Sequence, residues 1–140
     1  MSIVAVSLIL AFSGCNGGMR SKNESMSYKT TQLEGGLVKY DIAYIVRNDN
    51  DKDITYRFPS GKQFDIWVIC DGKEVFRESN GKVYTQSPTS FTLKPNETKI
   101  FNTSWTVDQR SLGDQNTVIS VYAGLQSLKP IVCTFTNLLQ

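Results

Sequence analysis

The sequence predicts an all-β protein, an immunoglobulin-like antiparallel β-sandwich that follows an N-terminal signal segment and a flexible tether. Two observations carry this prediction. Short segments rich in β-branched and aromatic residues alternate apolar with polar side chains, which is the period of a half-buried strand. Turn residues separate these segments about every 8–12 positions, the spacing of sandwich strands, and no segment has a convincing helical period. An open barrel is the alternative, because the two folds share this pattern.

The chain begins with the apolar run 3–12, which holds one serine and ends at Ser13-Gly14-Cys15. A spanning helix needs about 20 apolar residues, whereas a signal peptide carries about 7–15. Small residues directly before a cysteine resemble the lipobox of bacterial lipoproteins. This resemblance implies a signal peptide over residues 1–14 and lipid attachment at Cys15.

Two features depart from the lipobox pattern. Phe12 stands where the motif usually has an aliphatic residue, and no basic residue precedes Arg20. A signal peptide normally has a positively charged leader. The alternative is a buried N-terminal strand that happens to end near a cysteine.

Residues 15–32 are rich in Gly, Ser and Lys and show no apolar period, so they are expected to form a flexible tether. The sandwich domain is then expected over residues 33–140. Two lipid chains on Cys15 would hold the protein stably on a membrane. These expectations together place the domain in the cell envelope, outside the cytoplasm.

The apolar alternation predicts a series of short strands within this domain. The clearest covers residues 63–70, where apolar side chains stand on both faces, so a central position in its sheet is expected. Asp71-Gly72 then predicts a two-residue hairpin turn, because both residues accept positive φ. The expected strands are residues 37–46, 54–58, 63–70, 73–77, 91–93, 98–107, 117–125 and 131–135.

Composition argues against several functional classes. The chain has no histidine, which removes the Ser-His-Asp triad and histidine-based zinc sites. Its net charge is +2 without a basic block, so a nucleic-acid partner is not expected. The spacing of Asp49, Asp51 and Asp53 begins like a calcium loop, but Ile54 and Ser60 replace the required glycine and glutamate. We therefore expect no catalytic residue, metal or cofactor.

The three cysteines show no Cys-x-x-Cys spacing that would indicate a metal or redox site. If Cys15 carries lipid, Cys70 and Cys133 remain as a pair and are the candidate disulfide. The alternative is that they are buried free thiols, which behave as small apolar side chains.

Three stretches, 56–65, 71–79 and 93–98, are followed by Trp105, and in this order they resemble the BsuPI family of bacterial intracellular proteinase inhibitors. The resemblance covers about Leu37 to Leu125 and implies an immunoglobulin-like sandwich with inhibitor-like activity. Residues 116–118 replace the family's usual Gly-x-Tyr start of the last long strand. The family name also says intracellular, whereas the N-terminus suggests export.

The favoured function is a membrane-anchored, non-enzymatic module that binds and occludes a protease, with a serine protease as the candidate partner. A preorganised loop loses little entropy on binding, and the polar loop 78–90 is the best candidate. Tyr84, Gln86 and Pro88 are its candidate contact residues. The alternative is a non-inhibitory envelope scaffold or adhesion module.

Overall fold

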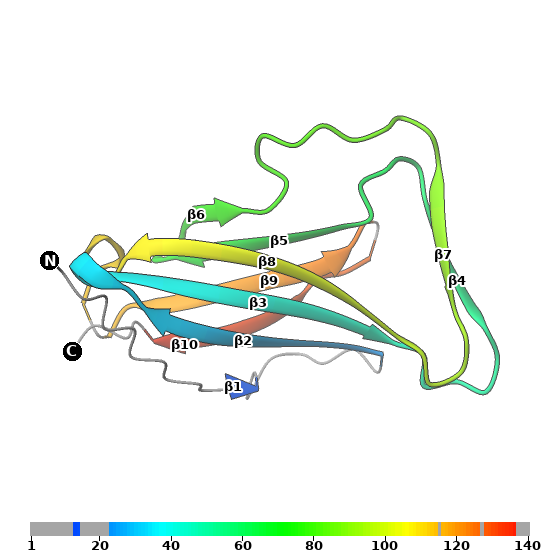
Figure 1. The fold of residues 1–140 in the computed structure, drawn as a ribbon, viewed down its shortest axis with the longest axis horizontal. Coiled ribbons are helices and arrows are strands. Elements are labelled where there is room, and N and C mark those ends of the chain that lie inside the picture. The colour runs from blue at the N-terminus through cyan, green and yellow to red at the C-terminus, as the bar shows by residue number, and fades with distance from the viewer. Residues whose placement is uncertain (1–12, 15–22, 115, 127, 137–140) are drawn as a thin grey trace, which may run out of the picture.

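The computed structural model describes residues 13–14, 23–114, 116–126 and 128–136, and these residues form an all-β protein. Two four-stranded antiparallel sheets face each other, and a two-stranded arm lies across one end of them (Figure 1). The predicted all-β sandwich is therefore confirmed. No helix within the described ranges is long and apolar enough to cross a membrane.

The first sheet has the order β1-β2-β3-β8. Its β3–β8 ladder is unbroken from the pair Leu37–Asp108 to the pair Arg47–Thr98. A 3₁₀ turn at Glu34–Gly36 joins β2 to β3. The strands are β1 (Ser13–Gly14), β2 (Glu24–Gln32), β3 (Leu37–Arg47) and β8 (Thr98–Asp108).

The second sheet has the order β10-β9-β5-β6, and β5 lies inside it, as predicted from its two apolar faces. The β5–β6 hairpin turns at Asp71 and Gly72, whose φ angles are 52° and 76°. Both residues of the turn thus have the positive φ that Asp-Gly favours. The strands are β5 (Phe64–Cys70), β6 (Lys73–Arg77), β9 (Val118–Leu125) and β10 (Ile131–Thr136).

The arm consists of β4 (Ile54–Phe58) and β7 (Thr89–Leu93), which follow β3 and precede β8. Its junction with the first sheet is organised by Asn48, which is fully buried. The Asn48 Nδ2 donates to the carbonyls of Lys52 at 2.8 Å and Leu93 at 2.9 Å. Its Oδ1 accepts the Asn50 N–H, so one side chain satisfies three backbone groups of the corner.

The core between the sheets is rich in stacked aromatic rings. Tyr40 of β3 stacks on Trp105 of β8 with 5.0 Å between the ring centroids. Phe64 of β5 lies 4.4 Å from Phe101 of β8 and so joins the two sheets. These contacts pack the faces that the apolar alternation predicted to be buried.

The prediction of a flexible tether is wrong for residues 24–32, which form β2 and pair with β3 along their whole length. Met26 and Thr30 of this strand are buried, whereas the residues between them are half-buried. Its serines and lysine give this segment the composition of a linker, and it shows no apolar alternation. It is a strand because its backbone pairs with β3, which the sequence pattern does not reveal. Residues 15–22 lie outside the described part of the chain.

Of the expected signal peptide, residues 1–14, the structure describes only Ser13–Gly14. These two residues form β1 and pair with Ser27 and Tyr28 of β2. The expected lipid attachment at Cys15 falls on a residue that the structure does not describe.

The prediction of a Cys70–Cys133 disulfide is wrong, because Cys70 is a free, buried thiol. Cys70 is paired with Ile119 and Cys133 with Val121, so β9 separates the two cysteines. Two strand spacings amount to about 10 Å, whereas the Cα atoms of a disulfide are about 4.4–6.8 Å apart. The Cys70 thiol instead lies 3.4 Å from the Leu112 carbonyl oxygen, its hydrogen-bond acceptor.

Candidate functional site

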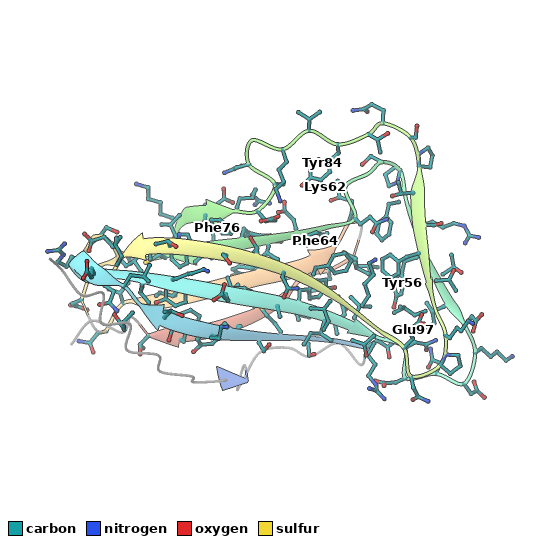
Figure 2. The ribbon with its side chains drawn as sticks, in the orientation of Figure 1. Tyr56, Lys62, Phe64, Phe76, Tyr84 and Glu97 are labelled. Atoms are coloured by element: carbon teal, nitrogen blue, oxygen red, sulfur yellow. The ribbon has the colours of Figure 1, made fainter. Side chains whose placement is uncertain are left out.

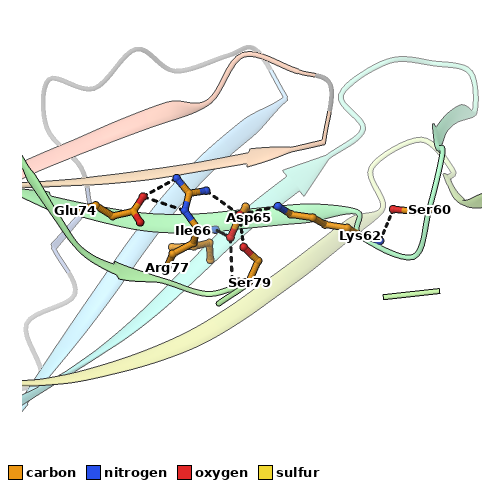
Figure 3. Close-up of polar contacts among 7 residues, drawn as sticks. All are labelled: Ser60, Lys62, Asp65, Ile66, Glu74, Arg77 and Ser79. Atoms are coloured by element: carbon orange, nitrogen blue, oxygen red, sulfur yellow. Dashed lines mark hydrogen bonds and ion pairs between the residues drawn. The ribbon is translucent and has the colours of Figure 1, made fainter. Parts of the chain in front are cut away.

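The candidate site is built on Asp65, which lies near the start of β5 and is 5% exposed. Its Oδ2 accepts from the Ser79 hydroxyl at 2.7 Å and the Arg77 guanidinium at 2.9 Å, and lies 3.0 Å from Lys62 Nζ (Figure 3). Its Oδ1 accepts the N–H groups of Ile66 at 3.0 Å and Ser79 at 3.2 Å. We call Lys62, Asp65, Arg77 and Ser79 the Asp65 cluster.

The surroundings of the carboxylate hold it in the charged form. Burial alone raises the pKa of Asp65, but hydrogen bonds from Ser79, Lys62 and Arg77 outweigh this effect, so the pKa is lowered. The cluster therefore pairs a buried anion with two partly exposed cations. Such a cluster fixes the positions of the segments that supply its members.

Arg77 connects the Asp65 cluster to the outer face of the second sheet. Its guanidinium also bonds Glu74 through Nε at 2.9 Å and Nη2 at 2.7 Å. The same group lies 4.7 Å from the centre of the Trp67 ring, which stacks on Tyr122 at 5.5 Å. Lys62 and Arg77 are thus held in defined positions by these contacts.

The turn 59–63 and the loop 78–88 touch each other above the Asp65 cluster. The Gly61 N–H donates to the Thr85 carbonyl at 2.8 Å. A Cβ on Gly61 would lie 2.6 Å from Thr85 Cγ2 and 3.1 Å from its backbone nitrogen, so only glycine fits this approach. Thr89, the first residue of β7, adds a link directly after the loop, because its Oγ1 donates to the Ser60 carbonyl at 2.7 Å.

The first residue of the loop, Glu78, is held at both its backbone and its side chain. Its N–H donates to the Ile66 carbonyl at 2.8 Å. Its two carboxylate oxygens accept from Thr103 of β8 and from Lys82. The loop thus starts from a point fixed to both sheets.

The predicted contact residues occupy different environments in this loop. Gln86 and Pro88 are exposed, whereas Tyr84 is half-buried and points toward the Lys62 turn (Figure 2). Val83 was not predicted and is 97% exposed. An apolar residue inside a polar loop was the signal available in the sequence. The loop ends at Pro88, because β7 already starts at Thr89.

Within the described ranges, no group of three or more Cys, Asp or Glu side chains could hold a metal ion. Of the three aspartates with calcium-loop spacing, Asp49 is paired with Arg47 at 2.7 Å.

The fold and this geometry define a small all-β module with an exposed loop that hydrogen bonds hold to the sandwich. The chain belongs to the BsuPI family, described as intracellular proteinase inhibitors, whose sequence model matches residues 24–123. The matched range includes β2, which the resemblance noted above did not cover. It also contains every member of the Asp65 cluster and the whole loop 78–88.

Comparisons with individual proteins add little to this assignment. No curated protein matches the chain. Among solved structures, a crystal structure of a protein from Archaeoglobus fulgidus is similar, with 16% identity and a TM-score of 0.42. The similarity covers 85% of this chain and 100% of that one.

The family assignment bears on three expectations. Proteinase inhibitor families are in general non-enzymatic, and their description implies a protease as the partner. The expected location outside the cytoplasm is contradicted, because the family is described as intracellular. That expectation depended on the N-terminal run and cysteine, not on the sandwich itself.

Proposed function

We propose that this chain binds a serine protease and occludes its active-site cleft with the loop 78–88. The observation that carries the proposal is that the exposed loop is fixed at three points. Ser79 is bonded to Asp65, Glu78 to Thr103, and Thr85 to Gly61. We expect the chain to act by binding alone, without catalysis.

Fixing the loop before binding favours a tight complex. Ordering a flexible side chain at an interface costs about 0.5–1.5 kcal/mol, and an unanchored loop must also order its backbone. Here the buried carboxylate of Asp65 and the contact between Gly61 and Thr85 order the loop in the free protein. A protease can then bind it at little further cost in entropy.

The loop also carries side chains suited to a cleft. Val83 presents its whole side chain to solvent, and exposed Gln86 and Pro88 follow it. An apolar side chain that is exposed in the free protein gains free energy when a pocket buries it, about 1.5–3 kcal/mol for full burial. We therefore add Val83 to the predicted contact residues and expect Tyr84 to support the loop from beneath.

A non-inhibitory binding module is the second candidate. It is favoured by Trp67, Tyr122 and Arg77, which stack on the outer face of the second sheet. Trp, Tyr and Arg are the residue types that dominate binding energy at protein interfaces. In this alternative the loop would contribute nothing to binding.

Active-site labelling tests the proposal. A cell extract of the source organism is treated with a fluorescent fluorophosphonate, which reacts with accessible catalytic serines, with and without the purified full chain. We expect labelling of at least one serine protease to fall as the chain is added. Unchanged labelling of every protease at saturating chain would contradict the proposal.

A loop replacement separates the two candidates. Residues 80–87 are exchanged for a Gly/Ser linker of equal length, which keeps Glu78 and Ser79 in place. Inhibition should be lost while the domain stays folded. A matched control replaces Tyr122 with Ser on the outer sheet face, and this variant should inhibit normally. Retained binding by the loop-replaced chain, with binding lost in Tyr122→Ser, would favour the non-inhibitory binding module.

A further inference from the structure

The free edge of β8 is an unprotected pairing site. Within the part of the chain that the structure describes, β8 closes one side of the first sheet and pairs only with β3. Among the described residues, no backbone hydrogen bond outside that ladder reaches residues 98–108. The edge is 11 residues long and its register with β3 has no bulge. Long, flat strand edges are the places where another chain can add a strand.

The hydrogen bonds at the end of β3 show which β8 residues face this edge. Arg47 donates to Asn23 on the β2 side, whereas the next residue, Asn48, donates to Glu97 on the β8 side. Antiparallel ladders alternate in this way at every second residue. Of β8, only the odd-numbered residues therefore bond to β3. The N–H and C=O groups of the even-numbered residues Ile100, Asn102, Ser104 and Thr106 point to the free edge.

The side chains along this stretch do not block pairing. Natural sheets protect their edges with charges, prolines, bulges or very short strands. Between Ile100 and Val107 β8 has no charge, proline or glycine. In contrast, the edge strand β6 of the second sheet is five residues long, carries Lys73, Glu74 and Arg77, and has a register shift opposite Val68 and Ile69.

The position of the edge indicates what would pair with it. Thr103, in the middle of β8, is bonded to Glu78, the first residue of the proposed protease-binding loop. The ring centroids of Trp105 in β8 and Phe76 in β6 are 6.1 Å apart, and Phe76 stands two residues before that loop. A strand added to β8 would thus run beside the loop 78–88.

We propose that an extended segment of the bound protease pairs with β8 as an additional antiparallel or parallel strand of the first sheet. This proposal rests on the proposed function and names a second contact for the same partner. Backbone hydrogen bonds would hold the segment at Ile100, Asn102, Ser104 and Thr106, and the loop would contact the cleft beside it.

Amide hydrogen exchange of the full chain, followed by NMR, tests this pairing. In the free chain, the amides of Ile100, Asn102, Ser104 and Thr106 should exchange fast and those of Phe101, Thr103 and Trp105 slowly. In the complex with the protease identified by labelling, the four fast amides should become slow. Fast exchange of these four amides in a fully inhibited complex would overturn the proposal.

Two variants at Asn102 give an independent test. Asn102→Pro removes one edge donor without breaking a bond to β3, since this N–H faces away from β3. Asn102→Ala removes the same side chain but keeps the N–H. We expect Asn102→Pro to weaken protease binding about tenfold or more and Asn102→Ala to leave it nearly unchanged. Slow exchange of the β3 amides in both variants would show that the first sheet is intact.

The remaining outcomes are distinguishable. If wild type inhibits a protease and Asn102→Pro inhibits it equally, the edge proposal is wrong and the proposed function stands. If the wild-type chain inhibits no protease, both the edge proposal and the proposed function are wrong. If the edge amides become slow in the chain alone as its concentration rises, a second copy of the chain occupies the edge, and the protease assignment of this edge is wrong.

Discussion

Ser79 is hydrogen-bonded twice to Asp65, through its N–H to Oδ1 at 3.2 Å and through its hydroxyl to Oδ2 at 2.7 Å. These two bonds join the start of the loop 78–88 to the start of β5. The residues lie 14 positions apart in the sequence, Asp65 within β5 and Ser79 just after β6. The two bonds therefore fix the loop to the sandwich, and the loop is where we place protease binding.

Asp65→Asn should destabilise the fold by about 2–3 kcal/mol, because the nearly buried partner of Lys62 and Arg77 loses its charge. Urea unfolding at neutral pH measures this change. Glu74→Gln is the matched control, since it removes a carboxylate from the same arginine at an exposed position and should cost under about 1 kcal/mol. Equal effects of the two substitutions would contradict the central place of Asp65.

The Asp65 carboxylate should also make the free energy of unfolding fall at acidic pH. Because the pKa of Asp65 is lowered in the fold, its contribution is fully present above the ordinary value of 3.8 and is lost as the pH falls through the lower native value. The free energy of unfolding should therefore fall more steeply below about pH 4 in wild type than in Asp65→Asn. Parallel curves for the two proteins would show that Asp65 is not a stabilising anion.

Gly61→Ala should displace the loop, because the added Cβ would overlap Thr85 Cγ2 at 2.6 Å. We expect inhibition to weaken more than stability. Adding Thr85→Ser removes that methyl group and keeps the hydroxyl bond to the Ser87 N–H, so the double variant should recover part of the inhibition. Wild-type inhibition by Gly61→Ala alone would mean that the position of Thr85 does not matter.

Two core tyrosines should respond oppositely to replacement by phenylalanine. No described residue bonds the buried Tyr40 hydroxyl, so Tyr40→Phe should stabilise the fold by about 1 kcal/mol. The Tyr44 hydroxyl bonds the Glu24 carboxylate, so Tyr44→Phe should cost about 1–2 kcal/mol. Thermal unfolding of both variants checks the difference, and a loss of stability in Tyr40→Phe would show that its hydroxyl is paired.

Tyr40 also predicts a loss of stability in alkali. Burial, with smaller effects of Tyr28 and Cys70, raises the pKa of Tyr40 to about 12. The fold therefore prefers the neutral over the charged phenol, and the free energy of unfolding falls as the pH rises from the ordinary value of 10.0 through about 12. Tyr40→Phe should unfold less readily above about pH 10 than wild type, measured by circular dichroism.

Cys70 should resist alkylation in the folded protein, because it is buried and burial raises the pKa of its thiol. Iodoacetamide followed by peptide mass analysis should label it only after unfolding. A peptide in which Cys70 is linked to Cys133 would contradict the strand order of the second sheet.

Much of the fold could be predicted from local pattern. The β5–β6 hairpin was accessible because Asp71-Gly72 fixes the turn and the flanking residues alternate. β2 could not be predicted in this way, because its residues are mostly polar and it is a strand only through its pairing with β3. The position of Cys133 relative to Cys70 depended on strand order, which alternation does not contain.

The site was predicted only in outline. Loop length pointed to residues 78–90, and Tyr84 was chosen for its aromatic ring, although packing turns it inward. Its neighbour Val83, which the prediction did not include, is the exposed apolar side chain of the loop. The links from Ser79 to Asp65 and from Gly61 to Thr85 join segments distant in sequence, and no local signal specifies such contacts.

The central claim is most directly tested by titrating the active, unlabelled protease, once labelling has identified it, with the full chain while following hydrolysis of a short peptide substrate. We predict that activity falls to near zero at about one chain per protease, whereas the chain with residues 80–87 replaced inhibits at least about a hundredfold more weakly. Undiminished inhibition by the loop-replaced chain, or hydrolysis unaffected by wild type, would contradict the account.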